Sequence, residues 1–398
     1  MEEKQLFAEK GKLAHVYASG IRAVMNRAAE LKREGKPVIS FSAGEPDFDT
    51  PADIRHAASA AMENHMTHYS SARGELCLRE EIAKKILRDT GVDYDPETEI
   101  LVTSGGSEAI FNTMEALVNR GDEVIIPVPA FGNYENSVIL AGGTPVTVPL
   151  DPGRQFALDP DEIENRITDR TRMIVLNSPN NPTGAIYSRA SMEAVAALAR
   201  RYDLWIFSDE IYSSIVYEDM KFCSPASFAD MKERTIMMNG FSKAYAMTGW
   251  RLGYAACPKE IMDALVKVHQ YLTCTSPTFL QIGAAEGMNT EGTREETERM
   301  KKAFAQRRQM ILSELGTMQG LSFVKPAGAF YIMVDVGGLG LTGKEFSSRL
   351  LETKYTAVVP ADAFGSWYKN WVRISYAASE ENIREGMARI RSMAAEYC

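Results

Sequence analysis

Cysteine is scarce in this chain, and its few copies are scattered. The 398 residues include five cysteines, at positions Cys77, Cys223, Cys257, Cys274 and Cys398. No two of them form a Cys-x-x-Cys pair, and an odd, scattered set disfavours a disulfide framework and a cysteine-based zinc site. The histidines His65 and His68 have a spacing that could bind metal on a helix, but we interpret both as surface residues and expect no metal.

Long apolar runs and an excess of positive charge are also missing. No stretch of about 18 apolar residues occurs, so we expect no membrane span. The net charge of −9 disfavours nucleic acid and anionic membranes as partners, because phosphate binding needs clustered Lys and Arg. The first residues, Met1–Gln5, are acidic and lack an apolar signal core, so we expect a cytoplasmic protein.

What is present is an ordinary globular composition, with 45% hydrophobic and 24% charged residues, and enough length for two domains. Strand and helix patterns alternate through the middle of the chain. The predicted strands cover residues 99–103, 123–127, 144–148, 172–176 and 204–208, and the predicted helices cover 108–119 and 191–201. This alternation predicts an α/β domain with a mostly parallel sheet flanked by helices.

The chain ends predict a second, smaller α+β domain. Residues 293–315 form one long charged helix pattern, and Thr293 and Glu296 have the spacing of a capping box at its start. Residues 329–334 and 371–376 then resemble strands, and a helix over residues 20–35 is expected to join them from the N-terminal side.

Lys243 is the most informative residue. It follows a short apolar strand pattern over residues 235–238, and Arg251 lies eight positions further on. An amine beyond a strand end can attack a carbonyl, and a guanidinium can bind a phosphate. An aldehyde cofactor with a phosphate group, pyridoxal 5'-phosphate, needs both groups. The alternative is two ordinary surface cations near a turn.

Four further segments have features that suit such a cofactor. The glycines before the helix at Glu108 predict a phosphate cradle, because a helix N-terminus offers free N–H groups. Asp209 ends an apolar strand, at the sheet edge where α/β proteins bind ligands. Asn181 lies in a Pro/Gly-rich turn, and Arg373 lies in an apolar strand where a guanidinium needs an anion. The simpler alternatives are an ordinary turn, a helix cap and an internal salt bridge.

Several strings resemble one family. Residues 239–243 (Asn-Gly-Phe-Ser-Lys), 247–253 (Met-Thr-Gly-Trp-Arg-Leu-Gly) and 181–184 (Asn-Pro-Thr-Gly) are similar to motifs of the class I and II aminotransferases, the fold type I enzymes that use pyridoxal phosphate. The wording is closest to the I-gamma subgroup, and the similarity runs from about Ser40 to Tyr376. The resemblance implies a large cofactor-binding domain over residues 47–295, a small domain from 13–46 and 296–398, and an N-terminal arm over 1–12.

The resemblance also implies roles at the cofactor ring. Lys243 forms the Schiff base and moves the substrate proton, and Asp209 holds the ring nitrogen protonated. Tyr212 and Asn181 bind the ring oxygen. Phe131 stacks on the ring, although by itself it would more often be a core residue.

At the phosphate, the resemblance implies contacts from Gly106, Ser107 and Arg251, and from Tyr69 of a neighbouring subunit. The active unit is then a homodimer with shared sites. Many relatives have a hydroxyl residue at the position of Gly240, so that contact is absent here or comes from another group.

At the substrate, the resemblance implies that Arg373 binds the α-carboxylate, together with Gly44 and Asn181, and that Phe330 closes over the substrate. The reaction is transfer of an amino group from an L-amino acid to a 2-oxo acid, with 2-oxoglutarate the expected acceptor. Ser107 and Leu272 stand where aspartate-specific relatives have cations, so the donor is left open among aromatic, aspartate and broad-range choices.

Two other functions fit parts of the sequence. A carbon–sulfur β-lyase or a related elimination enzyme would use the same cofactor on the same frame. A regulator that binds the cofactor without catalysis is the alternative from another class, but such proteins usually have an added DNA-binding domain, and residues 1–40 contain no basic cluster for one.

Overall fold

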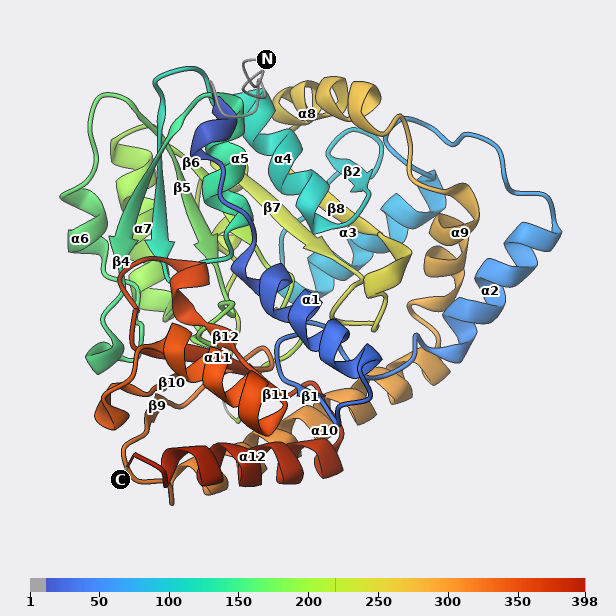
Figure 1. Cartoon of the computed structure of the whole chain (residues 1–398). Coiled ribbons are helices and arrows are strands. Elements are labelled where there is room, and N and C mark those ends of the chain that lie inside the picture. The colour runs from blue at the N-terminus through green and yellow to red at the C-terminus, as the bar shows by residue number, and fades with distance from the viewer. Residues whose placement is uncertain (1–11, 219, 398) are drawn as a thin grey trace, which may run out of the picture.

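The computed structural model describes residues 12–218 and 220–397. Its largest sheet has seven strands (Figure 1). In spatial order these are β2 (Ile100–Thr103), β8 (Gly253–Ala256), β7 (Thr235–Gly240), β6 (Trp205–Asp209), β5 (Thr171–Asn177), β3 (Glu123–Val128) and β4 (Thr144–Pro149). The strands from β7 to β4 are parallel, and β8 runs antiparallel to both of its neighbours. The predicted α/β class with a mostly parallel sheet is confirmed.

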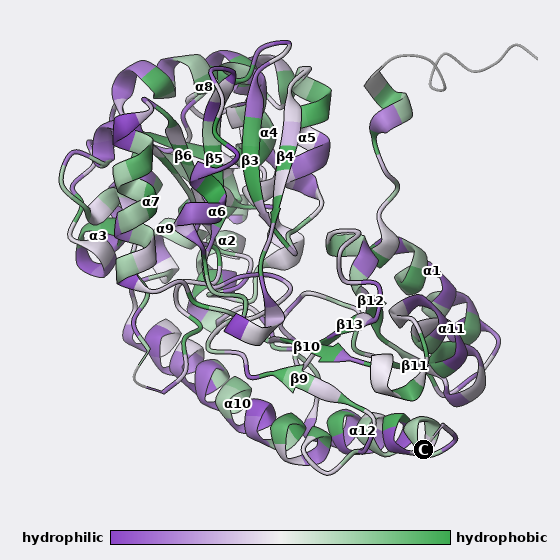
Figure 2. Ribbon diagram, turned by 90° about the vertical axis from the view of Figure 1, so that its left-hand side faces the viewer, coloured by the Kyte–Doolittle hydropathy of each residue, from purple (hydrophilic) through white to green (hydrophobic). Residues whose placement is uncertain are grey.

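Helices cover both faces of this sheet. The helices of this part are α2 (Ala52–Glu63), α3 (Leu76–Thr90), α4 (Gly106–Leu117), α5 (Asn133–Ala141), α6 (Pro160–Glu164), α7 (Arg189–Arg201), α8 (Lys259–Leu272) and α9 (Thr278–Gly287). In Figure 2, α4 and α5 lie on one side of the sheet, and α3 and α7 lie on the other. Because both faces are covered, strands such as β2, β3 and β7 are buried along their whole length.

A second group of elements lies below the sheet in Figure 1. It contains an antiparallel sheet of β12 (Val359–Pro360), β13 (Trp371–Ser375), β10 (Tyr331–Asp335) and β9 (Ser322–Val324), and a parallel pair of β1 (Ile39–Ser40) with β11 (Thr356–Ala357). Its helices are α1 (Gly20–Arg33), α10 (Glu291–Leu315), α11 (Gly343–Lys354) and α12 (Glu380–Ala394). Ile39 and Phe41 share one hydrophobic core with Ile374 and Ile390, so segments near both ends of the chain form this unit. The domain boundaries at residues 47 and 295 stay a prediction, and most of the expected arm over 1–12 lies outside the described residues.

The start of α10 differs from its prediction. The N-cap is Thr290, whose hydroxyl accepts a hydrogen bond from the Thr293 N–H at 3.2 Å. Glu296, the expected partner of a capping box, instead accepts from the Ala52 N–H at 3.2 Å. The predicted start at Thr293 was therefore wrong by one turn, because two threonines three residues apart can each cap a helix.

The described residues contain neither a membrane-spanning helix nor a group of metal ligands. No helix between residues 12 and 397, residue 219 left aside, is both long enough and apolar enough to span a bilayer. Within the same residues, no three His, Cys, Asp or Glu side chains are grouped so that they could hold a metal ion. His65 and His68 are exposed, as their interpretation as surface residues requires.

Candidate active site

A cavity lies where the carboxyl ends of β5, β6 and β7 face the second sheet. Its lining combines predicted residues with others, namely Ile21, Gly44, Gly106, Ser107, Ile110, Phe131, Tyr134, Asn177, Asn181, Asp209, Ile211, Tyr212, Met238, Ser242, Lys243, Arg251, Tyr331 and Arg373. Residues far apart in the sequence thus meet at the sheet edge where α/β proteins bind ligands. Of the site residues expected from the sequence, the structure brings all but Tyr69 and Phe330 into this cavity.

Lys243 lies just beyond the end of β7, and its side chain reaches across the cavity. Its Nζ donates a hydrogen bond to the Gly44 carbonyl oxygen at 2.5 Å. Burial lowers the pKa of the Lys243 amine to about 8, and the charges of Arg251 and Arg373 act in the same direction against that of Glu45. A substantial fraction of this amine is therefore neutral, and so nucleophilic, near neutral pH.

Asp209 is the last residue of β6 and is buried. Burial raises the pKa of its carboxyl group to about 6, against hydrogen bonds from the Tyr134 hydroxyl at 2.5 Å and the Ile211 N–H at 3.0 Å. These partners are both neutral, and no ion pair within the described ranges includes Asp209. A buried carboxylate with neutral partners favours a cationic ligand, and the protonated nitrogen of a pyridine ring is one.

Arg373 projects from β13 toward the cavity from the opposite side. Its guanidinium donates to the Asn181 Oδ1 at 3.0 Å and to the Ser42 carbonyl at 2.6 Å, and its Nε has no partner. It lies over the rings of Tyr331 and Phe364, with centroids at 4.5 and 4.9 Å.

The charge of Arg373 has no counterion in the described part of the chain. The side chain is 1% exposed, and burial lowers the pKa of its guanidinium. The internal salt bridge that the sequence left open is not found among the ion pairs of these residues, since all of the guanidinium's partners there are an amide oxygen, a carbonyl and aromatic rings. A buried, unpaired cation that borders a cavity favours an anionic ligand.

The loop that was predicted to form a phosphate cradle lies between β2 and α4. Gly105 has a φ of +77°, and a Cβ there would lie 2.5 Å from Arg251 Nη2, so the loop needs glycine. Gly106 and Ser107 begin α4 and line the cavity, with their backbone N–H groups at the helix N-terminus. Arg251 donates to the Thr248 carbonyl at 3.0 Å and lies beside the loop.

The position without a hydroxyl, Gly240, has little free space. A Cβ there would lie 3.0 Å from the Gly253 Cα and 3.2 Å from the Leu252 carbonyl oxygen. Ser242, two residues on, lines the cavity and is the nearest hydroxyl in the sequence to that position.

Tyr212 and Tyr331 form a pair at the cavity wall. Their hydroxyl oxygens lie 2.7 Å apart, and either can donate. Burial, then the neighbouring Tyr331, raise the pKa of Tyr212 well above its ordinary value. Asn181 lies on the same side through its bond to Arg373. Phe131 lines the cavity and meets the Tyr134 ring edge-on, with centroids at 6.0 Å.

The structure does not place Phe330 at the cavity, which corrects its expected role over the substrate. Phe330 is fully buried in the smaller core, with its ring centroid 5.1 Å from that of Phe304 and 5.5 Å from that of Tyr212. Its neighbour Tyr331 lines the cavity instead. Phe330 lies in the turn that precedes β10, and its ring packs against that of Tyr331, with centroids 4.8 Å apart, on the core side of that residue.

Tyr69 also lies away from the cavity. It is 88% exposed, and the surface also exposes Tyr271, at 94%, and Leu272, at 49%. Its expected contact belongs to another subunit's site, so that role stays a prediction. Sequence reasoning missed Tyr134, although it lies three residues from Phe131, and it missed Tyr331 by choosing the adjacent Phe330. Ile21, from the start of α1, had no signal in the sequence.

Comparisons with known proteins agree with this geometry. The sequence model of the family described as "Aminotransferase class I and II" matches residues 36–390. An aspartate aminotransferase of Pyrococcus abyssi is 41% identical over 98% of this chain and 99% of its own, and aromatic-amino-acid aminotransferase 2 of Thermococcus litoralis is 41% identical over 97% and 98%. The solved structure of Thermus thermophilus aspartate aminotransferase with maleate superposes with a TM-score of 0.92 at 39% identity, covering 96% of this chain and all of that one.

Proposed function

This chain belongs to the class I and II aminotransferases, and we propose that it transfers the amino group of L-amino acids with neutral as well as acidic side chains to 2-oxoglutarate. Transfer of an amino group with pyridoxal phosphate is the activity of the family, and relatives at about 41% identity are named aminotransferases, which favours transfer over the elimination and regulator alternatives. The observation that most supports the proposed site is the buried Arg373, which has no counterion among the described residues and lies in one cavity with Lys243 and Asp209.

The residues at the cavity fit the cofactor at three points. Lys243 offers a neutral amine for its aldehyde, Asp209 offers a carboxylate for its ring nitrogen, and Gly106, Ser107 and Arg251 surround the place for its phosphate. When bound, the cofactor supplies a conjugated ring that takes up the electron pair released when the substrate Cα–H bond breaks.

Other residues are assigned to the cofactor ring. Phe131 is assigned to its face, and Tyr212 and Asn181 to its oxygen, because all three line the same cavity as Asp209. Tyr134 holds the Asp209 carboxylate in place through its 2.5 Å hydrogen bond. The aromatic residue assigned to the substrate is now Tyr331, since Phe330 is in the core.

The protein's own groups then orient the substrate and move its proton. The two outer nitrogens of Arg373 match the two oxygens of an α-carboxylate, and the Gly44 backbone borders the same place. The Lys243 Nζ would take the proton from the substrate Cα and deliver it to the former aldehyde carbon of the bound cofactor, because a group with a pKa of about 8 can both accept and give up a proton near neutral pH.

The choice of donor depends on whether a cation awaits a second carboxylate. Among the described residues that line the cavity, the cations are Lys243, Arg251 and Arg373, and each already has a role. Ser107 instead accepts a hydrogen bond from Asn133 at 3.3 Å, and Leu272 does not line the cavity. Arg22, in the first turn of α1 next to the cavity residue Ile21, could offer a further cation, but its side chain is exposed and does not line the cavity. The relatives do not decide, because enzymes named for aspartate and for aromatic amino acids are equally identical to this chain.

Steady-state rates test the donor proposal. With 2-oxoglutarate as acceptor, the ratio of kcat/KM for aspartate over phenylalanine should stay below about a hundredfold. A larger preference needs a desolvated cation at the distal carboxylate, since one such contact is worth about 2–5 kcal/mol. A larger ratio would show that a distal cation exists. The variant Leu272→Arg, which restores a cation expected in one aspartate-specific subgroup, should raise the ratio.

We further propose that the enzyme is a cytoplasmic homodimer. The few, scattered cysteines suit a reducing compartment, and the exposed Tyr69, Tyr271 and Leu272 suit a surface covered by a second copy. Sedimentation of the purified enzyme should give twice the chain mass. A monomer with full activity would contradict both the dimer and the shared phosphate site at Tyr69.

A further inference from the structure

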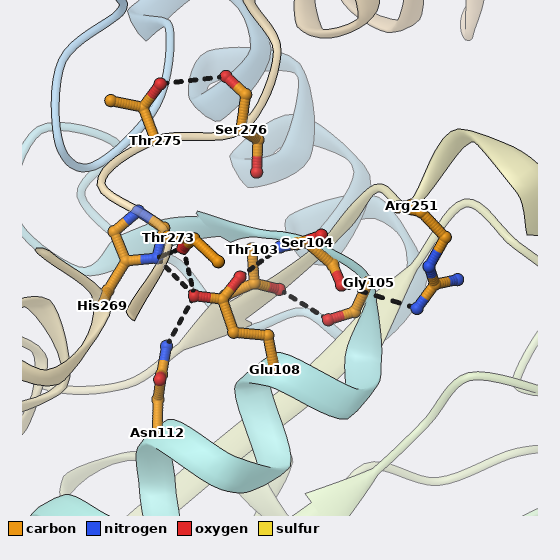
Figure 3. Close-up of polar contacts among 10 residues, drawn as sticks. All are labelled: Thr103, Ser104, Gly105, Glu108, Asn112, Arg251, His269, Thr273, Thr275 and Ser276. Atoms are coloured by element: carbon orange, nitrogen blue, oxygen red, sulfur yellow. Dashed lines mark hydrogen bonds and ion pairs between the residues drawn. The ribbon is translucent and has the colours of Figure 1, made fainter. Parts of the chain in front are cut away.

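A buried polar cluster lies beneath the phosphate cradle (Figure 3). At its centre is Glu108, the third residue of α4, which is not among the cavity-lining residues. One carboxylate oxygen, Oε2, accepts a hydrogen bond from the Ser104 N–H. The other, Oε1, accepts from His269 Nδ1 at 2.6 Å, from Thr273 Oγ1 at 2.7 Å and from Asn112 Nδ2 at 3.3 Å.

These contacts fix the loop that precedes the cradle from both sides. The N–H of Ser104 is held by Glu108 from below, and its carbonyl oxygen lies 3.5 Å from Arg251 Nη2 above. The next peptide is held as well, because Thr103 Oγ1 donates to the Gly105 carbonyl at 3.1 Å. The next two residues, Gly106 and Ser107, begin α4 and line the cavity.

His269 fixes the carboxylate itself. Its side chain is fully buried, and its Nε2 has no hydrogen-bond partner in the described part of the chain. Since a carboxylate only accepts, Nδ1 carries the proton that it donates. A buried imidazole with one unsatisfied nitrogen destabilises the core, so we infer that His269 contributes through the single hydrogen bond that it donates to Glu108.

Glu108 could otherwise disturb the site that it supports. It is a negative group in the first turn of the helix whose N-terminus faces the expected phosphate, and two anions there repel each other. Burial by itself would raise the pKa of Glu108, but the hydrogen bonds from His269, Ser104 and Thr273 outweigh it and lower that pKa, so the group stays charged. With both oxygens engaged, the carboxylate cannot turn toward the N–H groups of Gly106 and Ser107.

We propose that Glu108, locked by His269, is a positioning residue that holds the Ser104–Gly106 loop in the shape that binds the cofactor phosphate. This rests on the proposed function, in which Gly106, Ser107 and Arg251 surround that phosphate. Two effects of the carboxylate have opposite signs. By ordering the loop, the carboxylate strengthens phosphate binding, and by its negative charge it weakens that binding. The ordering effect is the larger of the two.

The test compares two probes on the full-length apoenzyme, pyridoxal phosphate and pyridoxal, by absorbance titration. Only the first has a phosphate, so the ratio of their Kd values isolates phosphate binding from ring binding. Glu108→Ala should raise the Kd for pyridoxal phosphate by about 10- to 100-fold, which corresponds to the loss of one hydrogen bond to a charged group. The Kd for pyridoxal should change by less than about threefold. Glu108→Gln should also weaken the binding of pyridoxal phosphate. A carboxamide has only one acceptor oxygen, so it cannot accept hydrogen bonds from both the Ser104 N–H and His269 Nδ1.

The carboxamide variant also decides between the two effects. If Glu108→Gln binds pyridoxal phosphate more tightly than the wild type, charge repulsion is the larger effect and the proposal is overturned. Equal weakening of both probes would likewise overturn it, since that result means general loss of structure. Glu115→Gln, an exposed glutamate on the same helix, is the matched control and should leave both Kd values unchanged.

The histidine is tested by a rescue. Asn places its Nδ2 where His places Nδ1, so His269→Asn should keep the wild-type ratio within about threefold, while His269→Leu should weaken pyridoxal phosphate selectively by about tenfold. If His269→Asn and His269→Leu behave alike, the imidazole serves packing alone and the proposal fails. Arg251→Ala separates this from failure of the proposed function: if it leaves the ratio unchanged, the phosphate does not bind at this loop at all.

Discussion

Replacing Arg373 should lower kcat/KM for every amino donor by the same factor. The guanidinium is held by Asn181 and the Ser42 carbonyl and lies over two aromatic rings, so its direction in the cavity is fixed before substrate arrives. All amino acid donors share the α-carboxylate that it is proposed to bind. Arg373→Ala leaves that carboxylate in a buried site without its counterion, whatever the side chain.

The expected size of the effect follows from burial. Removing one partner of a buried, hydrogen-bonded charge pair costs about 2–5 kcal/mol, which corresponds to roughly 30-fold to several thousandfold in kcat/KM. Arg373 is 1% exposed, so solvent does not screen the loss, and the upper half of the range is expected. Arg373→Lys keeps the charge but loses the paired geometry, and we expect it to lie between Ala and the wild type.

The assay measures kcat/KM for phenylalanine and aspartate with 2-oxoglutarate, together with the Kd for pyridoxal phosphate. The values of kcat/KM for both donors should fall by the same factor. The Kd for pyridoxal phosphate should change by less than about threefold, which corresponds to about 0.7 kcal/mol. Arg120→Ala, at an exposed arginine outside the cavity, is the control. Loss for aspartate alone would mean that Arg373 binds the distal carboxylate, and loss of cofactor affinity would mean that it supports the fold of the site. Either result refutes the reasoning.

Two other perturbations address the opposite wall of the cavity. Asp209→Ala should reduce kcat by orders of magnitude with little change in KM, because its charge matters most when the substrate carbon carries negative charge, and near-normal turnover would show that Asp209 only caps a turn. The rate at which apoenzyme captures pyridoxal phosphate should rise with pH through about 8, because the lowered pKa of Lys243 makes its amine neutral above that value. A stopped-flow rate that is flat from pH 6 to 9 would contradict this, and Lys243→Ala should show no such capture.

Most of the predicted site residues meet in one cavity because several of them lie at strand ends. Asp209 and Lys243 each follow an apolar run, and parallel strands bring their carboxyl ends to one edge of the sheet, so their meeting could be inferred without coordinates. The same logic found the glycines before α4, where a loop must approach a helix N-terminus. Periodicity likewise found the buried face of α10.

What the sequence could not show is which neighbours complete each contact. Tyr331 is the first residue of β10 and Phe330 belongs to the preceding turn, and the sequence contains no signal that separates the cavity residue from the core residue of this adjacent aromatic pair. The bond between Glu108 and His269 joins residues 161 positions apart, and each looks ordinary in its own helix. The strand β8 was missed because its four residues, Gly253–Ala256, contain too little pattern to distinguish a strand from a turn.

The most direct test of the central claim is the location of the cofactor on the chain. Purified enzyme should absorb in the near-visible range, and reduction with borohydride should fix the cofactor to a single peptide. Mass spectrometry of a digest should find the label on Lys243, and Lys243→Ala should lose both the fixed label and transamination. A label on any other lysine, or full transamination by Lys243→Ala, would contradict the account.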